Sequence, residues 1–208
     1  MVGKNIIVNG ISYKVIKIIG KGQAGYSYLL EMNNDYFVLK QFHNEINLKK
    51  TVLEKYNDEI NIYNMLLDIG ILMPKLIYSN SKEHYLIKEY IDGYTLAEIV
   101  GKGLLNERHI IQIFKMCKKI YKHGLNLDYF PTNFVEKDDI LYYIDYGCDK
   151  YTDDWNFENN GIYFLANTVG IAKFIEDGNY EALVNNGKPH KSGFESTVKN
   201  WLELKKIM

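Results

Sequence analysis

The sequence has few cysteines, few prolines and no excess charge of either sign. Its 208 residues include two cysteines and three prolines, and 25 basic residues face 26 acidic ones, for a formal net charge of −1. Two cysteines are too few for a disulfide framework in a chain long enough to bury its own core, so we expect Cys117 and Cys148 to be free thiols in a reducing compartment. A near-zero net charge gives no global positive field, and nucleic-acid binding is therefore not favoured.

Long apolar runs are also missing. No stretch approaches the roughly 18 consecutive apolar residues of a membrane span, and residues 1–5 lead into the short apolar run 6–8 without a signal-peptide pattern. We therefore expect a cytoplasmic protein with no membrane partner. A composition of 47% hydrophobic and 25% charged residues excludes disordered and collagen-like chains and fits one domain or two small lobes.

The first part of the chain contains short strand-type runs separated by glycine or by asparagine and aspartate. The runs are YKVIKIIG, YSYLLEM, DYFVLKQF, KLIYS and EHYLIKEYI. They predict an antiparallel sheet of about five strands. Between the third and fourth runs, residues 51–68 change period: Val52, Tyr56, Ile60, Tyr63 and Leu67 recur at helical spacing and predict one helix.

The second part is predicted to be mainly helical. Asn106 is expected to cap a helix that ends before Gly124, and further helices are expected at 162–176 and 194–206. NFVEK and ILYYI, which flank two aspartates, predict a β-hairpin. Trp155 and Phe157 are expected to anchor the last helices to the core. We place a lobe boundary near residues 91–94, which divides the chain into 1–91 and 92–208.

Three glycines lie in GKGQAGYSY, between two predicted strands. Bare backbone at Gly20, Gly22 and Gly25 would let amide groups approach phosphate oxygens closely. A dinucleotide-binding turn would need a helix directly after the glycines, whereas YSYLLEM is strand-like. The pattern therefore predicts either a loop that covers phosphates or a plain glycine-rich hairpin turn.

A lysine and a glutamate are predicted to meet. Lys40 shares one strand face with Val38 by alternation, and it could be an edge lysine that faces water. Glu59, however, falls on the apolar stripe of the helix that follows, three residues after Tyr56. A buried carboxylate needs a partner, so we expect an ion pair between Lys40 and Glu59.

The most informative segments are LDYFPTNF and YYIDYGC. Asp128 and Asn133 are five residues apart, and Asp145 follows a hydrophobic strand and precedes Gly147 by two residues. Each aspartate alone could be a turn residue. Carboxylate and amide oxygens of this kind suit Mg²⁺, and a carboxylate beside a transferring phosphoryl group can accept a hydroxyl proton. The five histidines, His190 among them, show no metal-ligand spacing, so zinc is not predicted.

In this order and spacing, the glycine loop, strand lysine, helix glutamate, Asp-x-x-x-x-Asn and Asp-x-Gly motifs resemble the protein-kinase superfamily over residues 20–147. The resemblance implies a two-lobed α+β fold: a five-stranded antiparallel sheet with one helix in the N-lobe, and a reduced, mainly helical C-lobe. It implies that Lys40 holds the ATP phosphates and pairs with Glu59, that Asp128 orients the acceptor hydroxyl, and that Asn133 and Asp145 hold Mg²⁺.

The same resemblance extends to the adenine side. KEYIDG resembles the interlobe hinge, which implies that the backbone of Glu89 and Ile91 meets the adenine edge and that Val38 lies over its face. Lys88 then occupies the gatekeeper position, which is usually apolar, and the sequence offers no account of it.

Several positions depart from the kinase pattern. Asn126-Leu127-Asp128 replaces His-Arg-Asp, so control by activation-loop phosphorylation is not expected, and Phe130 stands where protein kinases commonly carry a lysine. Ser27 and Tyr146 replace the usual apolar roof residue and the phenylalanine of Asp-Phe-Gly. Only 61 residues follow Gly147, without an Ala-Pro-Glu triplet, so we expect a reduced kinase similar in economy to RIO kinases and to compact bacterial serine/threonine-kinase-like proteins.

The resulting hypothesis is an enzyme that uses ATP and Mg²⁺ to phosphorylate a hydroxyl, chiefly Ser or Thr of a protein substrate. Two alternatives stay open. One is a small-molecule kinase of the aminoglycoside or choline type, against which the short C-terminal region counts because it offers no large acceptor-binding insertion. The other is a non-catalytic nucleotide-binding module, against which the retention of all five polar positions counts.

Overall fold

The computed structural model describes residues 1–22, 24–45, 50–189 and 192–207. Gln23 of the glycine-rich segment and His190 lie outside the described residues. The chain divides into two compact units. Unit 1 comprises residues 1–64 and 74–91, and unit 2 comprises residues 65–73 and 92–208.

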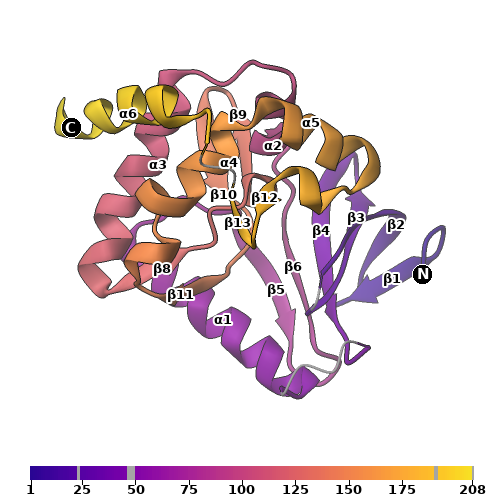
Figure 1. Cartoon of the computed structure of the whole chain (residues 1–208). Coiled ribbons are helices and arrows are strands. Elements are labelled where there is room, and N and C mark those ends of the chain that lie inside the picture. The colour runs from indigo at the N-terminus through magenta and orange to yellow at the C-terminus, as the bar shows by residue number, and fades with distance from the viewer. Residues whose placement is uncertain (23, 46–49, 190–191, 208) are drawn as a thin grey trace. The chain divides into compact units, whose positions relative to one another are not determined.

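Unit 1 is built on an antiparallel sheet with the strand order β1-β2-β3-β4-β6-β5 (Figure 1). The strands are β1 Asn5–Val8, β2 Ile11–Lys21, β3 Gly25–Met32, β4 Asp35–Phe42, β5 Leu76–Asn80 and β6 Tyr85–Glu89. The sheet has six strands, so the predicted number of five was wrong by one. The sixth is β1, which pairs with β2 across Asn9 and Gly10, whose positive φ angles of 49° and 77° suit a tight hairpin turn.

Helix α1, Val52–Ile69, covers one face of this sheet. Successive strand residues point to opposite faces, and accordingly Leu86 packs with Phe42 and with Tyr56 of α1, whereas Leu39 belongs to a separate core cluster. The predicted helical stripe is correct through Tyr63 and wrong at Leu67, which is 53% exposed while Leu66 is fully buried. Because an α-helix has 3.6 residues per turn, its buried face drifts away from a pattern of three- and four-residue steps. By the end of the helix the buried position has moved by one residue, from Leu67 to Leu66.

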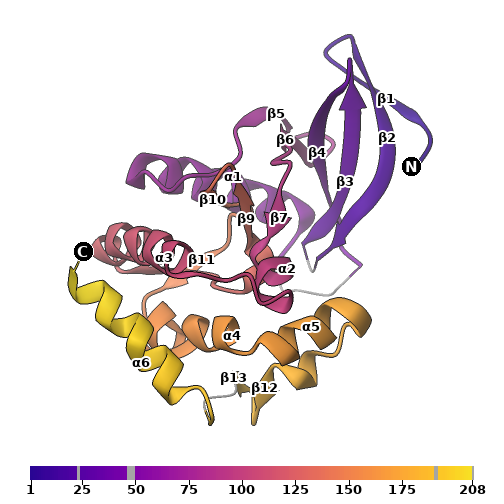
Figure 2. The ribbon, with the colours of Figure 1, turned by 90° about the horizontal axis from the view of Figure 1, so that it is seen from above.

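The described part of unit 2 contains five α-helices, several short helical turns and three small sheets. Its helices are α2 Leu96–Gly101, α3 Glu107–Ile120, α4 Ile162–Ala166, α5 Thr168–Asp177 and α6 Glu195–Leu204. Its strands are β7 Tyr94–Thr95, β8 Leu125–Leu127, β9 Phe134–Lys137, β10 Ile140–Tyr143, β11 Cys148–Lys150, β12 Val184–Asn185 and β13 Lys188–Pro189. The short turns are η1 Tyr121–His123, η2 Pro131–Asn133, η3 Asp153–Trp155, η4 Phe157–Gly161, η5 Tyr180–Ala182 and η6 Lys205–Ile207. In Figure 2, α4 lies between α5 and α6.

In unit 2, the structural features predicted from strong local sequence signals are present. Asn106 caps α3 by accepting a hydrogen bond from the Arg108 N–H, and Gly124 ends the following turn at φ 68°, as predicted. The hairpin of β9 and β10 turns through Asp138 and Asp139, both at positive φ. The expected helix over 162–176 is instead two helices, because the Asn167 side chain caps α5 through the Gly170 N–H and binds the Ala182 carbonyl.

Two further expectations concern cysteine and tryptophan. Cys117 and Cys148 are both free, as predicted. Phe157 is buried in the core of unit 2, whereas Trp155 is 62% exposed, so the prediction that Trp155 anchors the last helices was wrong. Among the described residues, no helix combines the length and the apolar character that crossing a bilayer requires.

Candidate active site

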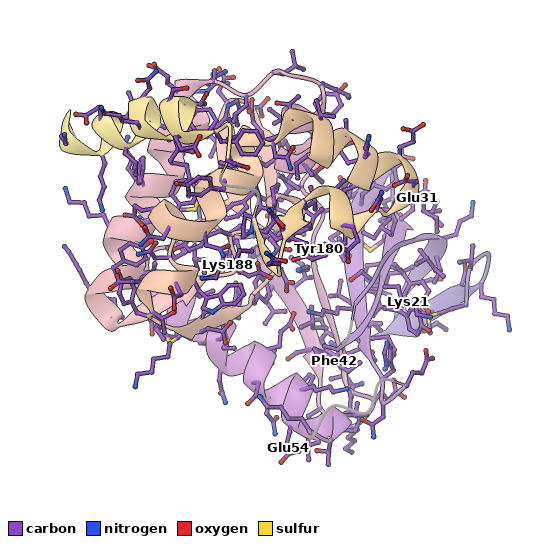
Figure 3. All side chains as sticks on the ribbon, in the orientation of Figure 1. Lys21, Glu31, Phe42, Glu54, Tyr180 and Lys188 are labelled. Carbon is purple, nitrogen blue, oxygen red and sulfur yellow. The ribbon has the colours of Figure 1, made fainter. Side chains whose placement is uncertain are left out.

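Lys40 and Glu59 form the predicted ion pair in unit 1. The Lys40 Nζ lies 2.6 Å from both carboxylate oxygens of Glu59, and the two side chains are 12% and 10% exposed. Lys40 comes from β4 and Glu59 from the buried face of α1. The Phe42 ring, labelled in Figure 3, lies 5.6 Å from the lysine nitrogen. A largely buried, bidentate pair fixes the ammonium group in place, where it can also attract an anion.

The glycines of the β2–β3 connection differ in what the fold demands of them. A Cβ at Gly25 would lie 2.4 Å from the Gln41 carbonyl oxygen, so the sheet itself requires glycine there. A Cβ at Gly20 would come no closer than 3.5 Å to the Ser27 side chain, and one at Gly22 would be 3.8 Å from the nearest described atom. Packing among the described residues of unit 1 therefore requires glycine at position 25 and makes no such demand at Gly20 or Gly22.

The predicted adenine-side residues also belong to unit 1. Val38 is buried and pairs with Lys88 across β4 and β6. The Glu89 N–H donates to the Lys75 carbonyl at 2.9 Å, and Ile91 is buried at the end of the unit. Lys88 is only 7% exposed and shares its face of β6 with Leu86, so the structure places a second lysine on the sheet face that carries Lys40.

Asp128, Asn133 and Asp145 come together in unit 2. The Asn133 side chain donates to the Asp128 carbonyl at 3.3 Å, and the Asn133 carbonyl accepts from the Ile144 N–H at 2.8 Å, next to Asp145. The Asp128 carboxylate accepts from the Phe130 N–H at 3.0 Å, which fixes its direction. The chain around Asp128 is thus folded back onto the segment that precedes Gly147.

Two interactions that were not predicted from the sequence hold the segments of Asp128 and Asp145 in register. Strand β8 ends at Leu127 and pairs with β11, which begins at Cys148, so the residues after one strand face those before the other. The buried Tyr143 hydroxyl accepts from the Asp128 N–H at 3.2 Å and donates to the Gly147 carbonyl. The only sign of this hydroxyl bridge in the sequence is the tyrosine two residues before Asp145. It occupies a core position of its strand, where an aliphatic residue could equally have stood.

The surroundings of Asp128 raise the pKa of its carboxyl group. The main cause is desolvation of the carboxyl group by the surrounding protein. The negative charge of Asp145 also raises the pKa, whereas the hydrogen bond from the Phe130 N–H lowers it. The side chain remains open to solvent, so the carboxyl lies in a concave place that water still reaches. A carboxyl in such a place is suited to exchange a proton with a bound hydroxyl group.

Phe130 has an aromatic environment that explains its presence in place of a lysine. Its ring contacts those of Phe164, Phe174 and Tyr180, with centroids 5.3, 5.2 and 6.2 Å apart. Three segments, α4, α5 and η5, thus meet on this one side chain. The half-buried Phe130 adds a fourth ring to this cluster, and this aromatic packing suits phenylalanine at position 130.

Comparison with known proteins gives one weak sequence match and a structural neighbour. The chain is 22% identical over 209 aligned positions to the KEOPS complex subunit Bud32 of Pyrococcus abyssi (strain GE5 / Orsay), an atypical protein kinase, and the match covers 91% of this chain and 87% of the relative. The resemblance to the protein-kinase superfamily is confirmed. No family model matches the sequence.

Among solved structures, the PF14_0431 kinase domain aligns with a TM-score of 0.49 and 19% identity over 71% of this chain. The aligned part spans only 54% of that structure, so this chain corresponds to about half of its length. The fold of the kinase-like chain is mixed α+β, with a curled antiparallel sheet and one helix followed by a mainly helical part. The sequence match to Bud32 supports phosphotransferase activity at the level of the superfamily only.

Proposed function

We propose that this kinase-like chain is an ATP- and Mg²⁺-dependent phosphotransferase that acts on a hydroxyl group. One observation carries the proposal: hydrogen bonds through Asn133 and Tyr143 bring Asp128 next to the segment of Asp145. The ion pair of Lys40 with Glu59 adds a fixed cation in unit 1. These groups are the ones that phosphoryl transfer needs for positioning and charge neutralisation.

The donor set of unit 2 fits Mg²⁺. Asp145 offers a carboxylate and Asn133 an amide oxygen, and Mg²⁺ usually takes one or two carboxylates together with phosphate oxygens and water. Among the described residues there is no cluster of three or more His, Cys, Asp or Glu side chains that would suit a closed metal site. When bound, the ion would neutralise the phosphate charge.

The chain's own residues have separate roles in the proposed reaction. Lys40 binds the α and β phosphates, and the backbone at Gly20 and Gly22 approaches the phosphate oxygens. Asp128 orients the acceptor hydroxyl and takes its proton as the hydroxyl oxygen bonds to the γ-phosphorus. The bond from that phosphorus to the bridging oxygen breaks, and ADP leaves with the electron pair. The proposal thus assigns roles to residues of the N-terminal part, 1–91, and of the C-terminal part, 92–208.

Two classes of acceptor are proposed. The resemblance favours Ser or Thr of a protein, and the family relationship supports no finer choice. A pocket beside Asp128 in unit 2 favours a second class, a small molecule.

Incubation of the purified chain with γ-labelled ATP and Mg²⁺ tests the proposal, alone and with cell extract. We expect label on a protein or on a small metabolite, and we expect the Asp128→Asn variant to give neither. Absence of label in every fraction, with ATP binding retained, would establish the non-catalytic alternative instead.

A further inference from the structure

The structure contains a pocket of about 570 Å³ that lies within unit 2 and opens beside Asp128. Asp128 is among its lining residues, whereas Asn133 and Asp145 are not among those that the structure describes as lining it. The pocket therefore borders Asp128, the proposed base, without being lined by the proposed metal ligands. Volumes of roughly 300–1,000 Å³ are typical of small-molecule sites, and one Ser or Thr side chain would leave most of this volume unfilled.

One wall of the pocket is aromatic. The Phe130 ring contacts those of Phe164, Phe174 and Tyr180, all four line the pocket, and the exposed Trp155 is a fifth aromatic lining residue. Tyr180 is labelled in Figure 3. Exposed aromatic rings next to a hollow offer flat faces on which the C–H groups of a compact ring can pack with little loss of side-chain entropy.

The remaining wall consists mainly of hydrogen-bond acceptors. Asp128 and Asp149 contribute carboxylates, and Asn126 and Asn160 contribute amide groups, with Lys150 as the one cation among the lining residues described. Asn126 is 2% exposed; its Nδ2 donates to the Thr152 carbonyl at 3.1 Å, and its Oδ1 has no hydrogen-bond partner among the described residues. A buried acceptor without a donor costs free energy, but this oxygen is buried, and the acceptors that a ligand hydroxyl can reach directly are the exposed carboxylates of Asp128 and Asp149.

We propose that this pocket is the acceptor site of the phosphotransferase and that it takes a small polyhydroxylated compound, such as a sugar or an aminosugar. Such a compound has donor hydroxyl groups around its edge and an apolar ring face, which match the acceptor wall and the aromatic wall. The hydroxyl that lies at Asp128 is the one phosphorylated. The proposal rests on the proposed function for the chemistry, but binding of the compound can be measured without ATP.

Trp155 provides the readout. The chain has two tryptophans, and Trp201 in α6 does not line the pocket, so the Trp201→Phe variant leaves Trp155 as the sole indole. We expect its fluorescence to change saturably with glucose or glucosamine, and label from γ-labelled ATP to appear on the same compound. Choline, which has a single hydroxyl, and dephosphorylated casein serve as the competing acceptor classes.

Two variants of pocket residues, compared with a matched control, distinguish loss of binding in the pocket from nonspecific effects of a substitution. In the Trp201→Phe background, Tyr180→Ala and Asp149→Ala should weaken binding of the responding sugar by about tenfold or more, the range expected for one lost contact or hydrogen bond. Tyr94→Ala is the control, because Tyr94 is similarly exposed, at 59% against 49% for Tyr180, and does not line the pocket. Tyr180 and Asp149 are both on the surface, so we expect both variants to fold.

The outcomes distinguish this inference from the proposed function. Label on casein or choline without a response of Trp155 to either sugar overturns the inference and leaves the phosphotransferase proposal intact. A response of Trp155 without transfer of label to the sugar overturns the acceptor role. Equal weakening by Tyr94→Ala and Tyr180→Ala would place the sugar outside the pocket.

Discussion

At the scale of single residues, the proposed chemistry depends on side chains that are held by neighbours. Asp128 is aimed by the Phe130 N–H, and Lys40 is held by both oxygens of Glu59. These contacts fix the position of each group before any ligand binds. Such positioning is the source of most of the rate enhancement in phosphoryl transfer.

Asp128→Asn should remove transfer and leave nucleotide binding nearly unchanged. The amide cannot take the acceptor proton, whereas it keeps an oxygen that can accept the Phe130 N–H bond. General-base contributions are typically about 10² to 10⁴ in rate, so we expect a loss of about that size in kcat, measured with γ-labelled ATP. Mg-ATP affinity, measured by calorimetry, should stay within about twofold; a parallel loss of affinity would assign Asp128 to the nucleotide.

Tyr143→Phe should impair turnover from a position that touches no substrate. Loss of the hydroxyl leaves the Asp128 N–H and the Gly147 carbonyl without their bridge, which should cost about 1–3 kcal/mol of unfolding free energy. Because the bridge positions Asp128, kcat should fall by about tenfold while the KM for Mg-ATP changes less. Tyr142→Phe is the matched control, since Tyr142 points to the other side of β10. Similar effects of both substitutions would exclude a positioning role for the Tyr143 hydroxyl.

At the scale of elements, the sequence predicted what depends on near neighbours. The strands β2 to β6, the capped helix α3 and the β9–β10 hairpin all follow from alternation, helical spacing or turn residues. Helix α2 was missed although its Thr95 and Glu98 form a capping box, a signal that was present in the sequence. The break at Asn167 could not be read, because the Asn167 amide binds Ala182 fifteen residues later.

The two glycines of the β2–β3 connection should respond differently to alanine. Gly25→Ala places a Cβ against the Gln41 carbonyl and should destabilise the chain by about 1–3 kcal/mol in urea unfolding. A Cβ at Gly22 comes no closer than 3.8 Å to a described atom, so the unfolding free energy of Gly22→Ala should be nearly unchanged. Its Mg-ATP affinity should fall, because the added methyl group keeps phosphate oxygens away from the backbone. Unaltered affinity in Gly22→Ala would reduce this segment to a plain hairpin turn.

At the scale of the whole molecule, the proposed function joins residues of two units that each have their own core. Lys40 belongs to unit 1 and Asp145 to unit 2. Since both tryptophans lie in unit 2, tryptophan fluorescence follows the unfolding of that unit and provides a way to detect whether a ligand links the two.

Mg-ATP should raise the unfolding temperature seen by tryptophan fluorescence, and Lys40→Ala should reduce that rise. A ligand at a hundredfold excess over its Kd stabilises the state that binds it by about 2.7 kcal/mol. A lysine of unit 1 can affect the signal of unit 2 in this way when one ligand binds residues of both. Lys50→Ala is the control, because Lys50 is an exposed lysine of unit 1 that pairs with Asp58. An equal rise in the wild type and Lys40→Ala would remove Lys40 from the nucleotide site.

The sequence by itself determined the order and type of the main elements and the identity of the polar residues, because periodicity, capping and motif spacing are local properties of the chain. Only the tertiary structure decided how these residues are supported. The Tyr143 bridge, the β8–β11 pairing and the pocket walled by Phe130, Trp155 and Tyr180 join segments that are distant along the chain. Such contacts arise from packing and from the need to pair buried polar groups, and no spacing rule within one segment encodes them.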